Sequence, residues 1–281
     1  MTGLADSVHA SIGSESAPLC WPGLAEQLVA HVFRGREDEV EAYSTTASMT
    51  GGLKMAHQER VVCSSGHPQV RTVVEVLPEG LEHHFEISGC RFLRTEEIER
   101  DGTVEMLVGA LDEVVAVGGF AGMLGPLIRR VHLMMPDDAA YDINFSDPAL
   151  PFSIFVSVQS LAPESFRWRL AEALVHEAGH LQLSLVERVV PLVTETSATF
   201  HAPWRGTQRP LGGVLHGLYV FGLIAEWMSR SGASPRLIQR RLAEICQDVD
   251  ALRDFPEARG LTPSGAALAR SICTRLDGLL V

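Results

Sequence analysis

Apolar residues recur with a helical period near the start of the chain and then give way to alternation. Between residues 21 and 47 they lie three or four positions apart, and Gly35 interrupts the pattern. This spacing predicts a helix with a break near its middle. Residues 61–93 instead alternate between apolar and polar side chains and are rich in Val, Ile and Phe. That pattern predicts short strands, separated by turns at 66–68 and 78–80.

The remainder of the chain alternates between strand-like and helix-like segments. Proline and glycine mark the borders, because proline suits the first turn of a helix and a glycine pair ends one. In order, the pattern predicts a helix at 104–117, strands at 131–135 and 152–158, a helix from 164 to 189 behind Pro163, a loop through 202–210, and helices at 213–230, 235–252 and 263–279.

These elements predict an α+β fold, with a mainly helical C-terminal half. Residues 1–20 are rich in Ser, Ala and Gly, which favours a flexible tail. Residues 21–130 form an expected α/β lobe and residues 131–281 an expected metal-binding catalytic lobe, the two making one compact unit. The specific expectation is a zincin-like helix packed on a small β-sheet.

Charge and cysteine content narrow the classes of function. The chain has 281 residues, 46% of them hydrophobic, so it can bury a large core. A formal net charge of −12 argues against binding nucleic acid or an anionic membrane by general electrostatics. Five dispersed cysteines without a C-x-x-C pair are typical of reduced thiols in a cytoplasmic protein. Neither a signal peptide nor a long uncharged apolar stretch is recognisable, which favours a cytoplasmic location.

The segment His176-Glu177-Ala178-Gly179-His180 is the strongest chemical signal. Residues four apart on a helix lie on the same face, so His176 and His180 can bind one metal ion together. Glu177 can then reach the open side of the ion, where it orients or deprotonates a bound water, as in a zinc peptidase. The long apolar helix around the motif strengthens this interpretation, because unpartnered histidines are costly to bury.

A catalytic metal needs a third protein ligand, and the sequence leaves several candidates. The residues after His180 do not follow the long zincin pattern with a third histidine six residues further on. His216 is the preferred candidate, since it lies at the start of the next long helix and is flanked by Gly213 and Gly217. The alternatives are His201, Glu187, Glu195 and Glu226.

Two arginines lie close together in the loop before that helix. Arg205 follows Trp204, and Arg209 precedes Pro210. A guanidinium held beside a rigid aromatic ring and a proline can grip a carboxylate with two hydrogen bonds. The alternative is a pair of solvated surface arginines.

The motif and its downstream context resemble the HExxH-motif peptide-modification proteins associated with ribosomally synthesised, post-translationally modified peptides. The resemblance is strongest over residues 140–230. It rests on Ser146-Asp147-Pro148-x-Leu150-Pro151, His176-Glu177-x-x-His180, Ala202-Pro203-Trp204-Arg205-x-x-x-Arg209-Pro210-Leu211 and Gly213-Val214-Leu215-His216-Gly217-x-Tyr219.

This resemblance implies an iron(II)- and 2-oxoglutarate-dependent dioxygenase that hydroxylates the β-carbon of residues in a precursor peptide during natural product biosynthesis. The implied iron ligands are His176, His180 and His216, which leave positions for 2-oxoglutarate and dioxygen. Arg205 and Arg209 would hold 2-oxoglutarate, and Glu177 would be the catalytic side chain. The strand at 152–158 would hold the peptide by edge pairing, with Phe155, Ser157 and Trp204 as substrate-binding residues.

Two other functions stay open at this point. One is a zinc-dependent peptidase that trims a leader or precursor peptide, with Zn²⁺ as the ion and Glu177 as general base. The other is a non-catalytic, metal-stabilised peptide-binding module. The expected partners are the precursor peptide and dioxygen, with a homodimer as an option and no nucleic acid or membrane.

Overall fold

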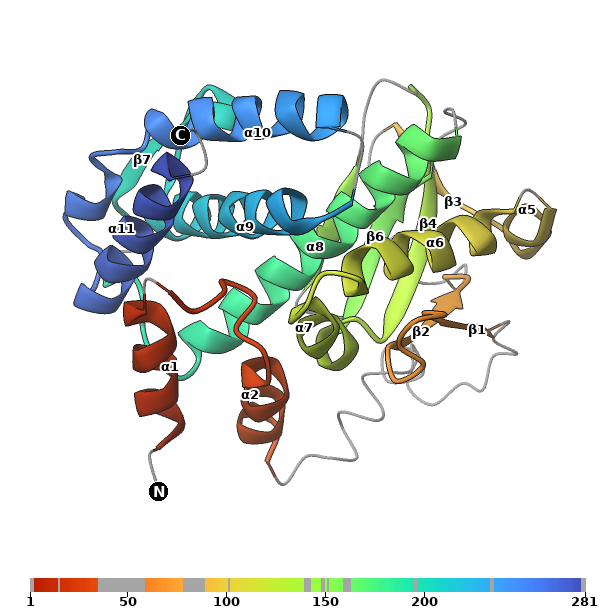
Figure 1. Cartoon of the computed structure of the whole chain (residues 1–281), viewed down its shortest axis with the longest axis horizontal. Helices are drawn as coiled ribbons and strands as arrows, with labels where there is room; N and C mark the ends of the chain where they lie inside the picture. Colours follow the sequence, from red (N-terminus) through yellow and green to blue (C-terminus); the bar gives the residue numbers. More distant parts are fainter. Residues whose placement is uncertain are drawn as a thin grey trace. The chain divides into compact units, whose positions relative to one another are not determined.

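The computed structural model describes residues 3–14, 16–34, 59–77, 89–100, 102–138, 143–147, 150, 152–158, 163–194, 197–232 and 235–278. They belong to two compact units (Figure 1). One comprises Phe33–Leu181, and the other joins Met1–Val32 to Gln182–Val281. This division differs from the predicted lobes at 21–130 and 131–281, because the N-terminal helices join the C-terminal ones. The second half of the predicted helix at 21–47 and the turn at 78–80 lie outside the described residues.

The unit Phe33–Leu181 is built on a mixed β-sheet, which confirms the α+β class. Its strands follow the order β1-β2-β4-β6-β5, and β3 also pairs with β4. Strands β2, β4 and β6 are parallel to one another, whereas β1, β3 and β5 each run antiparallel to their neighbour. The strand bounds are β1 Glu59–Cys63, β2 Arg71–Glu75, β3 Cys90–Phe92, β4 Arg130–Pro136, β5 Asn144–Ser146 and β6 Ser153–Ser157.

The strands predicted within 61–93, at 131–135 and at 152–158 are confirmed, and the burial of their side chains explains why these segments form strands. All five residues of β6 are buried, as expected for a strand with neighbours on both sides and covered faces. In β4, every residue from Arg130 to Met134 is buried as well. Val131 is in register with Ile154, and Leu133 with Val156, so apolar pairs line one face of the two strands.

Three short helices, α5 Thr95–Arg100, α6 Thr103–Val115 and α7 Phe120–Leu127, belong to the same unit. Helix α6 confirms the prediction at 104–117 and lies across the sheet in Figure 1. Its buried positions Val104, Leu107, Leu111 and Val114 repeat every three or four residues. Helix α7 was not predicted, because its short, glycine-containing and almost wholly apolar sequence has no clear period.

The second unit is helical apart from one hairpin. Long helix α8 Pro163–Glu187 contributes its last residues to it, and α9 Leu211–Arg230 packs against α10 Pro235–Asp250 and α11 Pro263–Asp277. All four helices were predicted, to within a few residues at each end. The remaining elements are α1 Leu4–Gly13, α2 Leu24–Val32, strands β7 Thr199–Ala202 and β8 Thr207–Pro210, and the 3-10 turns Pro203–Arg205 and Phe255–Glu257.

Two predictions in this unit are wrong. Residues 4–13 were expected in a flexible tail, but they form α1, which packs on α11 and buries Val8 and Ile12. The spacing of four between these two residues was obscured by the small polar residues around them. Residues 202–210 were expected in a loop, but β7 and β8 pair as an antiparallel hairpin.

Helix α9 is the one described helix that is long and apolar enough to cross a membrane. However, 72% of its most apolar stretch is buried inside the protein. Its apolar character is therefore explained by packing in the core, which is compatible with a soluble protein.

Candidate metal centre

Helix α8 brings the two motif histidines together, as their spacing requires. The Nε2 atoms of His176 and His180 lie 3.1 Å apart, and the ring centroids are 4.8 Å apart. Both rings therefore present the same nitrogen to one point beside the helix. The His176 side chain is 33% exposed, so this point is accessible from solvent.

Glu177 lies between the two histidines in sequence but is almost completely buried, with 1% of its surface exposed. The Ser146 hydroxyl of β5 donates a hydrogen bond to its carboxylate. Its Oε1 is 3.9 Å from His176 Nε2, whereas Oε2 is buried and accepts no hydrogen bond from the described residues. Burial raises the pKa of Glu177 from its ordinary 4.5 to about 7, and the hydrogen bond from Ser146 partly opposes this rise.

His216, the preferred third ligand, lies in the first turns of α9 and pairs with another candidate. Its Nε2 is 3.1 Å from Oε2 of Glu187, at the end of α8. Both side chains are partly exposed, at 17% and 32%. Glu187 is seven residues after His180, about two turns further along α8. The pair is consistent with Glu187 orienting the His216 ring, as carboxylates commonly do for metal-binding histidines.

The other candidates for the third ligand differ in their surroundings. His201 is exposed on β7. Glu226 accepts hydrogen bonds from the Leu19 backbone and Arg230 at the far end of α9, and Glu195 lies outside the described residues. Within the part of the chain that the structure describes, no three His, Cys, Asp or Glu side chains converge closely enough to hold a metal ion. The third ligand stays a prediction.

The β7–β8 hairpin carries the predicted 2-oxoglutarate and substrate residues. Arg205 and Arg209 are both exposed, and Trp204 is half-buried. The Trp204 indole packs on α9, in T-shaped contact with Phe221 at 5.1 Å between centroids. A Cβ on Gly217 would lie 2.2 Å from the indole, so this packing requires glycine there. Trp204 thus has a structural role, whereas a substrate role stays a prediction.

The prediction that strand 152–158 offers an edge to a peptide is wrong. Strand β6 lies between β4 and β5, so the backbone hydrogen bonds of its central residues are already made. Phe155 is fully buried, stacked on Phe145 at 4.3 Å and on His132 at 4.8 Å between centroids. The Ser157 hydroxyl accepts a hydrogen bond from the Ile143 amide. Neither predicted substrate residue presents a free surface.

Ser146 belongs to the segment Ser146–Pro151 that carries part of the family resemblance, but its residue type alone predicts no role for it. In the structure it is the hydrogen-bond partner of Glu177, contributed by a strand thirty-one residues earlier in the chain. The short β5 strand was not predicted, because three residues are too few to show alternation. No local pattern could have identified this contact.

The two histidines fit a divalent transition-metal ion. Imidazole nitrogens suit zinc, iron and copper, and a carboxylate oxygen that is buried without a partner is unusual unless another group completes its surroundings.

A scan against known protein-family models finds no match to this chain, and a search of curated protein sequences finds none either.

Proposed function

We propose that the protein is an iron(II)- and 2-oxoglutarate-dependent oxygenase that hydroxylates a β-carbon in a ribosomally made precursor peptide. The observation that carries this proposal is the convergence of His176 Nε2 and His180 Nε2 at 3.1 Å, beside the buried Glu177. We also propose that α8 packs on the sheet as the metal-binding helix of a zincin does. The hydrogen bond between Ser146 and Glu177, which joins β5 to this helix, supports that arrangement.

The separation of the two nitrogens suits two ligands of one ion. Nitrogens that each lie about 2.1 Å from a metal are about 3.0 Å apart at a right angle and about 3.4 Å apart at the tetrahedral angle. The observed 3.1 Å lies within this range, so both nitrogens can bind one ion. On a six-coordinate ion, two histidines and a third protein ligand would leave open positions for substrates.

Each remaining residue has a task under this proposal. His176, His180 and His216 hold the ion, and Glu187 fixes the His216 ring through their 3.1 Å contact. Arg205 or Arg209 pairs with the distal carboxylate of 2-oxoglutarate. When bound, iron would activate dioxygen, the oxidant: one oxygen atom would enter the peptide C–H bond, and the other would enter 2-oxoglutarate as it loses CO2 and becomes succinate. Glu177 accepts the hydrogen bond from Ser146, and its buried Oε2 would accept a second one from a group bound at the site.

Strand β5 replaces β6 as the proposed peptide-binding edge. Among the described residues β5 pairs only with β6, so its other edge offers backbone groups to an extended peptide. Ser146 at the end of β5 contacts Glu177, one position from His176. A peptide added along β5 would therefore pass beside the two histidines.

One observation favours a zinc-dependent peptidase as the second candidate. Burial raises the pKa of Glu177 to about 7, close to the value that suits a general base at neutral pH. In that role Glu177 would take a proton from a water on the zinc ion. The exposed arginines of the β7–β8 hairpin have no evident task in such an enzyme, which is why the oxygenase is preferred.

Mass spectrometry of a candidate precursor peptide tests the two functions. We expect the protein with iron(II), ascorbate and 2-oxoglutarate to add one oxygen to the peptide and to release succinate. Peptide cleavage in the presence of zinc alone would instead establish the peptidase. The matched control is the double variant His176→Ala, His180→Ala, which should leave the peptide unchanged under both conditions.

A further inference from the structure

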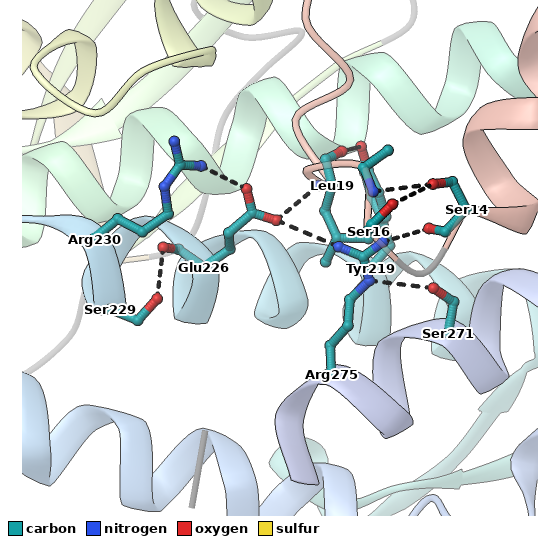
Figure 2. Close-up of polar contacts among 10 residues, drawn as sticks. Ser14, Ser16, Leu19, Tyr219, Glu226, Ser229, Arg230, Ser271 and Arg275 are labelled. Atoms are coloured by element: carbon teal, nitrogen blue, oxygen red, sulfur yellow. Dashed lines mark hydrogen bonds and ion pairs between the residues drawn. The ribbon is translucent and has the colours of Figure 1, made fainter. Parts of the chain in front are cut away.

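The helical unit contains a cavity of about 410 Å³ that has no part in the proposed metal chemistry. It lies between α9, α11 and the segment that links α1 to α2, all within the unit formed by Met1–Val32 and Gln182–Val281 (Figure 2). Sites for small organic molecules usually have volumes of about 300 to 1,000 Å³, so the cavity can hold such a molecule.

The wall formed by the linking segment is held firmly in place. The Tyr219 hydroxyl donates to the Leu19 carbonyl oxygen at 2.9 Å, and the Leu19 amide donates to Glu226 Oε2 at 2.7 Å. Nearer α1, Arg275 Nη2 donates to the Ser14 carbonyl oxygen at 2.5 Å. A Cβ on Gly222 would lie 3.0 Å from Leu19 and 2.8 Å from Ile272, so glycine permits this close packing. The cavity is therefore preformed.

Two arginines and one glutamate supply its charge. Arg230 Nη1 donates to Glu226 Oε1 at 2.9 Å, and Arg275 Nη1 is 4.0 Å from Glu226 Oε2 (Figure 2). The second separation is outside hydrogen-bond distance, whereas Arg275 donates from Nε to the Ser271 hydroxyl and from Nη2 to the Ser14 carbonyl oxygen. The side chains of Arg275 and Glu226 are 19% and 15% exposed, so water screens them only in part, whereas Arg230 is 41% exposed and more strongly screened.

The lining carries two guanidinium groups and one carboxylate, which favours an anionic ligand of single charge. We propose that the cavity binds an organic monocarboxylate with an apolar side group, such as the C-terminal residue of a peptide or a small free acid. Its carboxylate would bridge Arg230 and the Nη1 group of Arg275, because guanidinium groups match carboxylates in shape and charge. A dianionic phosphate would meet stronger repulsion from Glu226, and a cation would be repelled by both arginines.

The rest of the lining suits the apolar part of such a ligand. Pro18, Leu19 and Leu276 contribute apolar surface, and Gly222 of α9 also lines the cavity. Ser16 and Ser229 add hydroxyl groups. An apolar wall with a few charged groups that fix orientation is the usual composition of a small-molecule site.

Calorimetric titration of the metal-free protein with N-acetyl-leucine tests the proposal, with N-acetyl-leucinamide as the uncharged control. We expect the acid to bind at least about tenfold more tightly than the amide, because only the acid can form charge-assisted hydrogen bonds. The peptide N-acetyl-Ala-Ala-Leu shows whether the bound carboxylate belongs to a peptide C-terminus or to a small free acid. Tighter binding of this peptide than of N-acetyl-leucine indicates a peptide C-terminus, whereas equal binding indicates a small free acid.

Two substitutions in the lining test whether the acid binds in this cavity. Arg230→Gln should weaken binding of the acid about tenfold or more, and Ser229→Phe should abolish it by filling the cavity from its exposed rim. Arg240→Gln is the matched control, since it removes an exposed arginine that forms the same i, i+4 ion pair, with Glu244. Equal affinities for acid and amide, or equal losses in Arg230→Gln and Arg240→Gln, would overturn the proposal. The test needs no metal, so it is independent of the proposed oxygenase activity.

Discussion

Buried ionisable side chains have two different roles in this protein. Glu177 is buried beside the motif histidines, with a hydrogen bond from Ser146. His132, on β4, is fully buried within the sheet unit, where its Nδ1–H donates to the Glu75 carbonyl oxygen at 3.2 Å. Glu177 serves a candidate site, whereas His132 is a structural histidine. The two cases show why burial alone does not identify function.

His132 makes stability depend on pH. Burial lowers its pKa from 6.5 to about 4, against the effect of the hydrogen bond to Glu75, and the charge of Arg130 lowers it further. In the unfolded chain the His132 imidazole is protonated below about pH 6.5, whereas in the folded chain it stays neutral down to about pH 4. We expect the free energy of unfolding to be unaffected by this group above pH 6.5 and to fall by about 3 kcal/mol between pH 6.5 and 4.

Urea denaturation at several pH values checks this prediction. His132→Gln, which keeps a donor for the Glu75 carbonyl oxygen, should show a smaller loss of stability over the same interval. The control is His31→Gln, which removes an exposed histidine and should retain the wild-type profile. A His132→Gln profile that also matches wild type would contradict the assignment.

Metal binding by the motif should depend on both of its histidines. Because His176 and His180 present Nε2 atoms to one point, removing either imidazole should weaken binding of Co²⁺ or Zn²⁺ at least about a hundredfold. Titration of the metal-free protein, followed by cobalt absorption, measures this. His201→Ala, at an exposed position on β7, is the control and should bind like wild type.

The same titration decides the third ligand. We expect His216→Ala to abolish tight binding, and Glu187→Gln to weaken it about ten- to a hundredfold by removing the carboxylate that orients the ring. Full metal binding and full turnover in His216→Ala would remove that residue from the ligand set.

At the scale of elements, long periodic helices were predictable and short paired strands were not. The boundaries of α8, α9 and α11 follow from apolar spacing, proline and glycine. Strand β5 and the β7–β8 hairpin are only three or four residues long per strand, and β8 is fully exposed. Their pairing depends on the elements they meet, because no apolar alternation is present to define them.

Two glycines of α9 give a matched test of how the hairpin packs. Gly217→Ala should destabilise the protein by about 1–3 kcal/mol, because its Cβ would overlap the Trp204 indole. Gly213→Ala is the control, since nothing lies within 4 Å of its Cβ. It should stabilise α9 by up to about 1 kcal/mol. Chemical denaturation measures both values, and equal effects would refute the packing.

At the scale of the whole molecule, the net charge of −12 limits the class of partner. We expect no measurable binding to duplex DNA or to anionic vesicles at about 150 mM salt, because long-range repulsion opposes the approach of both. Fluorescence anisotropy and vesicle sedimentation measure this. Salt-dependent binding to either would instead reveal a local basic surface that outweighs the overall charge.

The long helices and the proximity of His176 to His180 were predictable from the amino-acid sequence. A spacing of four residues places both side chains on one helical face, whatever surrounds the helix. Contacts between residues far apart in the sequence could be found only in the folded structure: Ser146 with Glu177, Glu187 with His216, Leu19 with Glu226, and α1 with α11. It also placed β6 inside the sheet and thereby moved the proposed peptide edge to β5. Such long-range contacts depend on how the secondary-structure elements pack together, and the local hydrophobic periodicity contains no information about that packing.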